Sequence, residues 1–185
     1  DGDGRITGLV GMSADITAQK VAEDNAVRAQ LELAAKNRQI EAELLLARDL
    51  LTELMSSSVQ AVAEVFDGHA LFSPEIAYHY EPCEHLAGDF FQAIPLGAHR
   101  FGLLVCDVMG HGVKAALVTT LIRGLIADIQ ARDLDPGEVL RILNERLCVL
   151  LDRPPLPRFV TALYAVFDLG LGRVRLASAG HPWPL

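Results

Sequence analysis

The longest regular pattern in the chain is a stretch without Pro or Gly that runs from residue 17 to residue 55. Ala, Leu, Glu, Gln and Arg dominate this stretch, and charges of both signs are spread along it, as is typical of a long helix. Asp15 or Thr17 can cap its first turn. The pattern therefore predicts one long helix in this part of the chain.

From residue 33 onward, the apolar positions of this stretch repeat with the 3-4 spacing of a coiled coil. Leu33, Ile40, Ala47 and Leu54 occupy d positions, and Asn37, Leu44 and Leu51 occupy a positions. A single Asn at an a position favours a parallel two-stranded register. We therefore expect a parallel homodimer through residues 33–54. The alternative is a single amphipathic helix that packs on its own domain.

The pattern changes after this helix. We expect Ser56–Ser58 to interrupt it and residues 59–74 to form a linker, with a short helix over Val59–Phe66. The expected strands are Ile76–Tyr80, Asp89–Ile94, Phe101–Cys106, Phe159–Leu169 and Arg173–Ser178, and the expected helices are Val113–Ala131 and 136–151. Phe101–Cys106 is apolar on both faces, which predicts a central strand. The fold class is therefore α+β.

The start of the second helix is marked by three residues. Asp135 can serve as the N-cap, Pro136 stands at the first helical position and Glu138 at the third. We expect Pro154 and Pro155 to end this helix.

Composition narrows the class of protein. The formal net charge is −8, so the long-range field repels nucleic acid and anionic membrane surfaces. Cys83, Cys106 and Cys148 share no short spacing, which together with the lack of a signal peptide is typical of reduced thiols in a cytoplasmic protein. No apolar run approaches the roughly 18 residues that a membrane span needs.

Two carboxylates stand out by their positions. Asp89 begins a strand, and Asp107 follows the apolar strand Phe101–Cys106. If these strands form a hairpin about Leu96–Ala98, both side chains fall near the same end of the ladder. A divalent cation compensates buried or crowded carboxylates well, and two such ions can activate water and bind a phosphate ester. The alternative is that each Asp is an ordinary turn or cap residue.

Four segments carry a more specific signal. They are EPCEHLAGDFF at residues 81–91, CDVMGHG at 106–112 with Ala115-Ala116, FVTALY at 159–164, and ASAGHP at 177–182. In this order they resemble the motifs of SpoIIE/RsbU-type serine phosphatases, a family within the metal-dependent protein phosphatase (PPM) superfamily. The resemblance covers roughly residues 76 to 185.

This resemblance implies an α-β-β-α sandwich and two manganese or magnesium ions. Asp89 and Asp107 would be metal ligands, with Asp107 bridging and the backbone carbonyl of Val108 assisting. The implied reaction is the hydrolysis of phosphoserine or phosphothreonine on a partner protein, such as an anti-sigma-factor antagonist. Water would attack phosphorus directly, without a phosphoenzyme.

The chain departs from the family pattern in three places. Ala87 replaces the first Gly of its motif, and Gln92 stands where many members carry a second Asp. Further Asp ligands of the family come from a late Asp-Gly motif, which we expect beyond Leu185, so residues 1–185 alone are expected to be a truncated and inactive form. We expect His111 and His181 to order their loops and not to touch substrate.

The N-terminal segment resembles another family. Gly11-Met12-Ser13-Ala14-Asp15-Ile16-Thr17 is similar to the closing strand and exit motif of a PAS sensor domain. The expected order is therefore the end of a PAS domain at 1–16, a coiled-coil signalling helix at 17–58, a linker at 59–74 and the phosphatase domain at 75–185.

Two other functions compete with this one. Ala87–Phe91 echoes the Gly-Gly-Asp-Glu-Phe motif of diguanylate cyclases, and Asp49–Leu54 echoes their entry motif, although Phe90 stands where that motif needs an acid. The second alternative is a dimerisation and signal-transmission module without catalysis.

Overall fold

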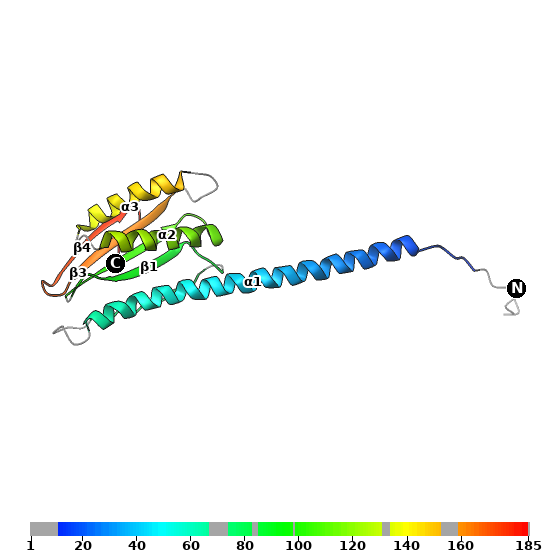
Figure 1. The fold of residues 1–185 in the computed structure, drawn as a ribbon, viewed down its shortest axis with the longest axis horizontal. Coiled ribbons are helices and arrows are strands. Elements are labelled where there is room, and N and C mark those ends of the chain that lie inside the picture. The colour runs from blue at the N-terminus through cyan, green and yellow to red at the C-terminus, as the bar shows by residue number, and fades with distance from the viewer. Residues whose placement is uncertain are drawn as a thin grey trace, which may run out of the picture. The chain divides into compact units, whose positions relative to one another are not determined.

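The computed structural model describes residues 11–66, 74–82, 85–97, 99–130, 134–152 and 159–184. These residues form helix α1 (Thr17–Phe66), strands β1 (Asp89–Pro95) and β2 (Arg100–Val108), helices α2 (Val113–Gln130) and α3 (Pro136–Leu151), and strands β3 (Val160–Asp168) and β4 (Arg173–Ala179) (Figure 1). Two compact units can be separated, residues 1–42 and 43–185, and the second contains the sheet. None of the helices described is long and apolar enough to cross a membrane.

The four strands form one antiparallel sheet in the order β1-β2-β3-β4. Helices α2 and α3, which connect β2 to β3, lie together on one face of this sheet (Figure 1). The α+β class is therefore confirmed. The prediction that Phe101–Cys106 is a central strand is also confirmed, because β2 lies between β1 and β3.

The main core lies between the sheet and the two helices. Leu104 from β2, Ile122 from α2, Leu143 from α3 and Tyr164 from β3 are all buried there. Gly102 makes room for the ring of Tyr164, since a Cβ at this position would lie 2.5 Å from the tyrosine hydroxyl oxygen. The core thus fixes how β2 and β3 pair, and this pairing positions the residues at the ends of both strands.

Helix α1 is longer than expected, and the predicted interruption at Ser56–Ser58 is wrong. Serine hydroxyls can bond back to the preceding helical turn, so a short run of serines need not end a helix. Ser58 Oγ donates to the carbonyl of Met55 at 2.6 Å and accepts the backbone N–H of Ala93 at 3.1 Å. Because β1 is an edge strand, Ser58 satisfies a donor that the ladder leaves unpaired.

The first half of the expected linker is also part of this helix. Val62 and Phe66 are buried in a second core cluster with Ala93 and Phe101. The rings of Phe66 and Phe101 meet edge to face, with their centroids 6.0 Å apart. Residues 59–66 therefore anchor α1 to the sheet instead of linking two domains.

The expected strand Ile76–Tyr80 is wrong, because this segment has no regular secondary structure. Its side chains pack instead: the ring of Tyr78 lies 4.7 Å from that of Phe91, and Ile76 packs against the second core cluster. Ser58 from α1 already covers the outer edge of β1 at Ala93, where an added strand would otherwise pair. Apolar alternation here reflects packing on the sheet.

The remaining boundaries agree with the prediction within two residues. Asp135 caps α3 as expected and accepts the N–H of Gly137 at 3.2 Å. Asp15 accepts the N–H of Thr17 at 2.9 Å at the start of α1, and hydrogen bonds from the side chain and the backbone of Thr17 lower the pKa of Asp15. The expected stop at Pro154 and Pro155 lies outside the described residues, as do residues 1–10. Residues 11–16 of the PAS-like segment have no regular secondary structure.

Candidate functional site

Asp89 and Asp107 face each other across the β1–β2 ladder. They are direct partners in the register, with Asp89 at the start of β1 and Asp107 near the end of β2. Directly opposite residues of an antiparallel pair have their Cβ atoms about 5 Å apart and their side chains on one face. The predicted juxtaposition of the two carboxylates at one end of the ladder is therefore confirmed.

Glycine holds the loops beside these carboxylates together. The N–H of Val108 donates to the carbonyl of Gly88 at 3.2 Å, and a Cβ on Gly88 would lie 2.1 Å from the carbonyl oxygen of Val108. The N–H of Gly112 donates to the carbonyl of Leu86 at 2.8 Å. Gly112 has a φ of +77°, which side chains rarely tolerate. The glycines of the 81–91 and 106–112 segments thus allow the backbone to pack closely beside Asp89 and Asp107.

The electrostatics of the pair are those of two like charges. Partial burial raises the pKa of Asp89, and the neighbouring charge of Asp107 raises it further, whereas His181 acts in the opposite direction. Burial, together with the charge of Asp89, also raises the pKa of Tyr80. Asp89 is therefore destabilised as an anion unless a cation compensates it.

Strand β3 adds a third residue to the same row. Asp107 is the register partner of Thr161, so Asp89, Asp107 and Thr161 lie side by side on one face of the sheet. Thr161 Oγ1 lies 2.9 Å from Nδ1 of His181, just beyond β4. The row therefore continues from two carboxylates through a hydroxyl to an imidazole. Thr161 belongs to the FVTALY segment, but only the register of β2 and β3 places it beside Asp107.

The donors fit a divalent cation in kind, since carboxylate oxygens are the ligands that magnesium and manganese prefer. Burial and then the neighbouring charge of Asp107 raise the pKa of Asp89, and a bound cation would oppose both effects. Among the described residues, however, no three His, Cys, Asp or Glu side chains gather into a group that could hold a metal ion. Two facing carboxylates could therefore supply only part of a coordination shell.

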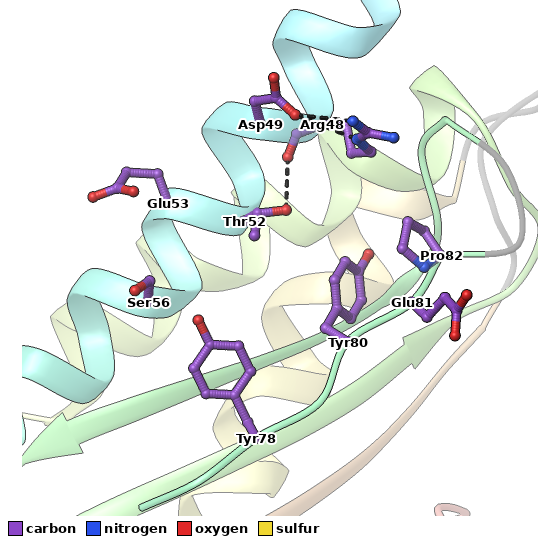
Figure 2. Close-up of a pocket in the computed structure, with 9 residues that line it drawn as sticks. All are labelled: Arg48, Asp49, Thr52, Glu53, Ser56, Tyr78, Tyr80, Glu81 and Pro82. Atoms are coloured by element: carbon purple, nitrogen blue, oxygen red, sulfur yellow. Dashed lines mark hydrogen bonds and ion pairs between the residues drawn. The ribbon is translucent and has the colours of Figure 1, made fainter.

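An open hollow of about 460 Å³ lies between the C-terminal half of α1 and residues 78–82 (Figure 2). The rings of Tyr78 and Tyr80 stand along one side of it, and Arg48, which bonds Asp49, stands on the other. Tyr80 also lines a small cavity that Asp89 borders. The hollow therefore adjoins the carboxylates through Tyr80.

Comparison with known proteins agrees with the motifs. Residues 97–185 match the family model described as Stage II sporulation protein E (SpoIIE). This match includes Asp107, Thr161 and His181, whereas Asp89 lies before it. The SiaA-PP2C domain of Pseudomonas aeruginosa has a similar structure, with a TM-score of 0.62, 23% identity, and coverage of 79% of this chain and 56% of that one. This last similarity shows the fold.

Two curated proteins of Bacillus subtilis (strain 168) are similar in sequence. Phosphoserine phosphatase RsbP is 31% identical over 109 residues, which are 58% of this chain and 27% of RsbP. Phosphoserine phosphatase RsbU is 26% identical over 100 residues, which are 54% of this chain and 29% of RsbU. The chain therefore spans less than a third of the length of either relative. Residues 97–185 thus match the SpoIIE family model, and the chain is similar, at low identity, to the phosphoserine phosphatases RsbP and RsbU.

Proposed function

We propose that this protein is a metal-dependent protein phosphatase that hydrolyses phosphoserine or phosphothreonine on a partner protein. The observation that carries the proposal is the facing pair of Asp89 and Asp107, held by the glycine contacts of two motifs within a fold similar to a PP2C domain. The relation to two phosphoserine phosphatases supports the same reaction class.

In this proposal, Asp89 and Asp107 hold manganese or magnesium, with the carbonyl of Val108 as a further oxygen ligand. When bound, the ions would neutralise the carboxylates and activate the attacking water. Gly88 fixes the spacing between the two strand ends, because any side chain there would displace the Val108 carbonyl. The partner is proposed to be a phosphorylated anti-sigma-factor antagonist, as the motif resemblance implies.

The test uses the protein at the length its gene encodes. Phosphate release from a phosphoserine protein is measured with manganese, with magnesium and with a chelator. Asp107→Asn is expected to abolish turnover and to leave the circular dichroism spectrum unchanged, since it removes a charge and no packing group. Asp152→Asn, at the exposed end of α3, is the matched control and keeps activity. Wild-type turnover in the Asp107 variant would refute the assignment.

We also propose that α1 forms a parallel coiled-coil dimer through residues 33–54. The d-position side chains of Leu33, Ile40 and Leu54 are 60%, 54% and 41% exposed, so a second helix could cover them. Leu51 is half-buried and lines a cavity of its own domain, which leaves the N-terminal part of this stretch as the stronger contact. Sedimentation is expected to show a dimer at tens of micromolar, and Asn37→Val is expected to raise the melting temperature. A monomer at that concentration would refute the dimer.

The segment before α1 is proposed to belong to a sensor domain. We propose that residues 1–16 end a PAS sensor domain and that α1 transmits its signal. Replacing the segment before α1 with a constitutive dimerisation domain is expected to make phosphate release independent of any stimulus. Unchanged activity and unchanged regulation would argue against such a role.

A further inference from the structure

Two kinds of contact hold His181 near the carboxylates: backbone contacts that fix its turn, and a side-chain contact that holds its ring. The turn that carries it is fixed by its backbone: Ser178 Oγ donates to the carbonyl of His181 at 2.7 Å, and Gly180 pairs with Ala162 in an isolated bridge. The bond between Nδ1 of His181 and Thr161 Oγ1 is additional to these. It orients the imidazole ring and is not needed to close the turn.

The ring nitrogens therefore have separate environments. Nδ1 is engaged by Thr161, whose register partner is Asp107. Nε2 is the remaining polar atom of a half-buried ring that is held by Thr161, the neighbour of Asp107 in the sheet. His181 is also close enough to Asp89 for its charge to influence that carboxylate. A small anion bound beside Asp89 and Asp107 would thus lie close to His181, whose Nε2 is not engaged by Thr161.

We propose that His181 is a catalytic residue whose Nε2–H donates a hydrogen bond to the phosphoryl group of the substrate, and that Thr161 positions it. A neutral imidazole supplies this donor when the threonine hydroxyl donates to Nδ1, because the ring proton then stands on Nε2. An imidazolium supplies it in either arrangement. No proton is transferred in this role. The inference rests on the proposed phosphatase function and names a contact of its substrate.

The geometry gives Thr161 a role that packing alone does not require. Its methyl group lies 3.8 Å from the position that a Cβ on Gly180 would take, so the side chain borders the turn without filling a core. Its hydroxyl is the group that reaches the ring. A catalytic imidazole oriented through its second nitrogen is a common arrangement, since one fixed nitrogen aims the other.

Two amide substitutions separate the nitrogens. In His181→Asn the amide takes the place of Nδ1 and can still bond Thr161, but no group replaces Nε2. In His181→Gln the longer amide reaches toward the position of Nε2. If His181 contacts phosphate, Asn is expected to lower kcat/KM for a phosphoserine protein about 10- to 100-fold, and Gln less, as for the loss of one hydrogen bond to a charged group. If His181 only orders its loop, Asn is the milder change, and the proposal is refuted.

Matched variants complete the kinetic test. Thr161→Val is expected to lower kcat/KM because the ring loses its orientation, and Thr161→Ser is expected to restore what Val removes. His79→Asn, at an exposed histidine that pairs with Glu81, is the control and keeps wild-type kinetics. Equal activity of the Val and Ser variants would show that the hydroxyl positions nothing.

A binding experiment does not depend on turnover. Inorganic phosphate is added to the full-length protein, with and without magnesium, while the imidazole ¹⁵N resonances are recorded. The Nε2 resonance of His181 is expected to shift in the wild type and much less in Thr161→Val, whereas that of His79 stays constant. A wild-type protein that turns over substrate but shows no shift at His181 overturns this inference alone. A protein that releases no phosphate under any condition overturns the proposed function itself.

Discussion

Removing one charge of the facing acid pair is expected to stabilise the protein. Asp89 and Asp107 stand directly opposite each other, which places their Cβ atoms about 5 Å apart. Two unit charges at about 5 Å repel by about 0.8 kcal/mol in water, and physiological salt reduces this to about 0.4 kcal/mol. Relief of the partial burial of Asp89 adds to this. Asp89→Asn is therefore expected to raise the free energy of unfolding by about 0.5–1 kcal/mol.

Urea unfolding without divalent cations measures this effect, because urea leaves the ionic strength low. For Asp89→Asn, the same gain in the free energy of unfolding corresponds to a rise of about 1–4 °C in the melting temperature. Asp107→Asn is expected to act similarly, and the double variant is expected to gain less than the sum, since either change alone removes the repulsion. Strictly additive gains would show that the two carboxylates do not interact, and the charge-pair argument would then be wrong.

The effect of Asp89 on stability is expected to depend on pH. The pKa of Asp89 in the folded protein is raised above its ordinary value of 3.8. The folded state therefore binds this proton more tightly than the unfolded state, so Asp89 costs stability at neutral pH and this cost disappears as the pH falls below 3.8. The advantage of Asp89→Asn over the wild type is thus expected at pH 7 and not near pH 3.5. Added magnesium or manganese is expected to stabilise the wild type and not the double variant.

Two further substitutions test the frame around the site. Gly88→Ala is expected to cost about 1–3 kcal/mol, because its Cβ would overlap a backbone carbonyl, whereas Gly124→Ala in α2, where the Cβ meets open space, is expected to be neutral or stabilising in the same chemical denaturation assay. Ser58→Ala is expected to cost about 1–3 kcal/mol by leaving a buried backbone N–H on β1 without an acceptor, whereas the exposed Ser57→Ala is expected to change stability by less than about 0.5 kcal/mol. Equal effects within either pair would contradict the structural reason given for it.

The sequence predicted the carboxylate pair because two local signals combined. Asp89 and Asp107 flank alternating or apolar strands, and the short span between these strands leaves a hairpin as the simplest connection. The distance from each Asp to the turn is nearly equal, so antiparallel pairing brings the side chains together. Local pattern and turn length were sufficient here because β1 and β2 are consecutive and joined by a short connection.

The sequence could not place Thr161 or the ring of His181. Thr161 follows β2 in the sheet only after two helices and about 50 residues, so its position depends on a long-range register that no local pattern encodes. Similarly, three consecutive serines read locally as a break, although tertiary contact with β1 makes Ser58 part of a continuous helix. Both misses concern residues whose partners are distant in the sequence.

The candidate site brings two like charges together at one end of the β1–β2 ladder. The facing carboxylates repel, and their strand ends are held at close range by the contact between Gly88 and Val108 instead of by any attraction between them. Thr161 extends the row and contacts the imidazole of His181. In the proposed function, a cation bound to the two acids and a substrate anion near the ring would balance the charges of this row. A row of this kind is costly for folding, because a neutral side chain in place of either acid would be more stable. The facing acids stand where the two glycine motifs meet, which favours the proposed phosphatase function over a purely structural helix-and-sheet module.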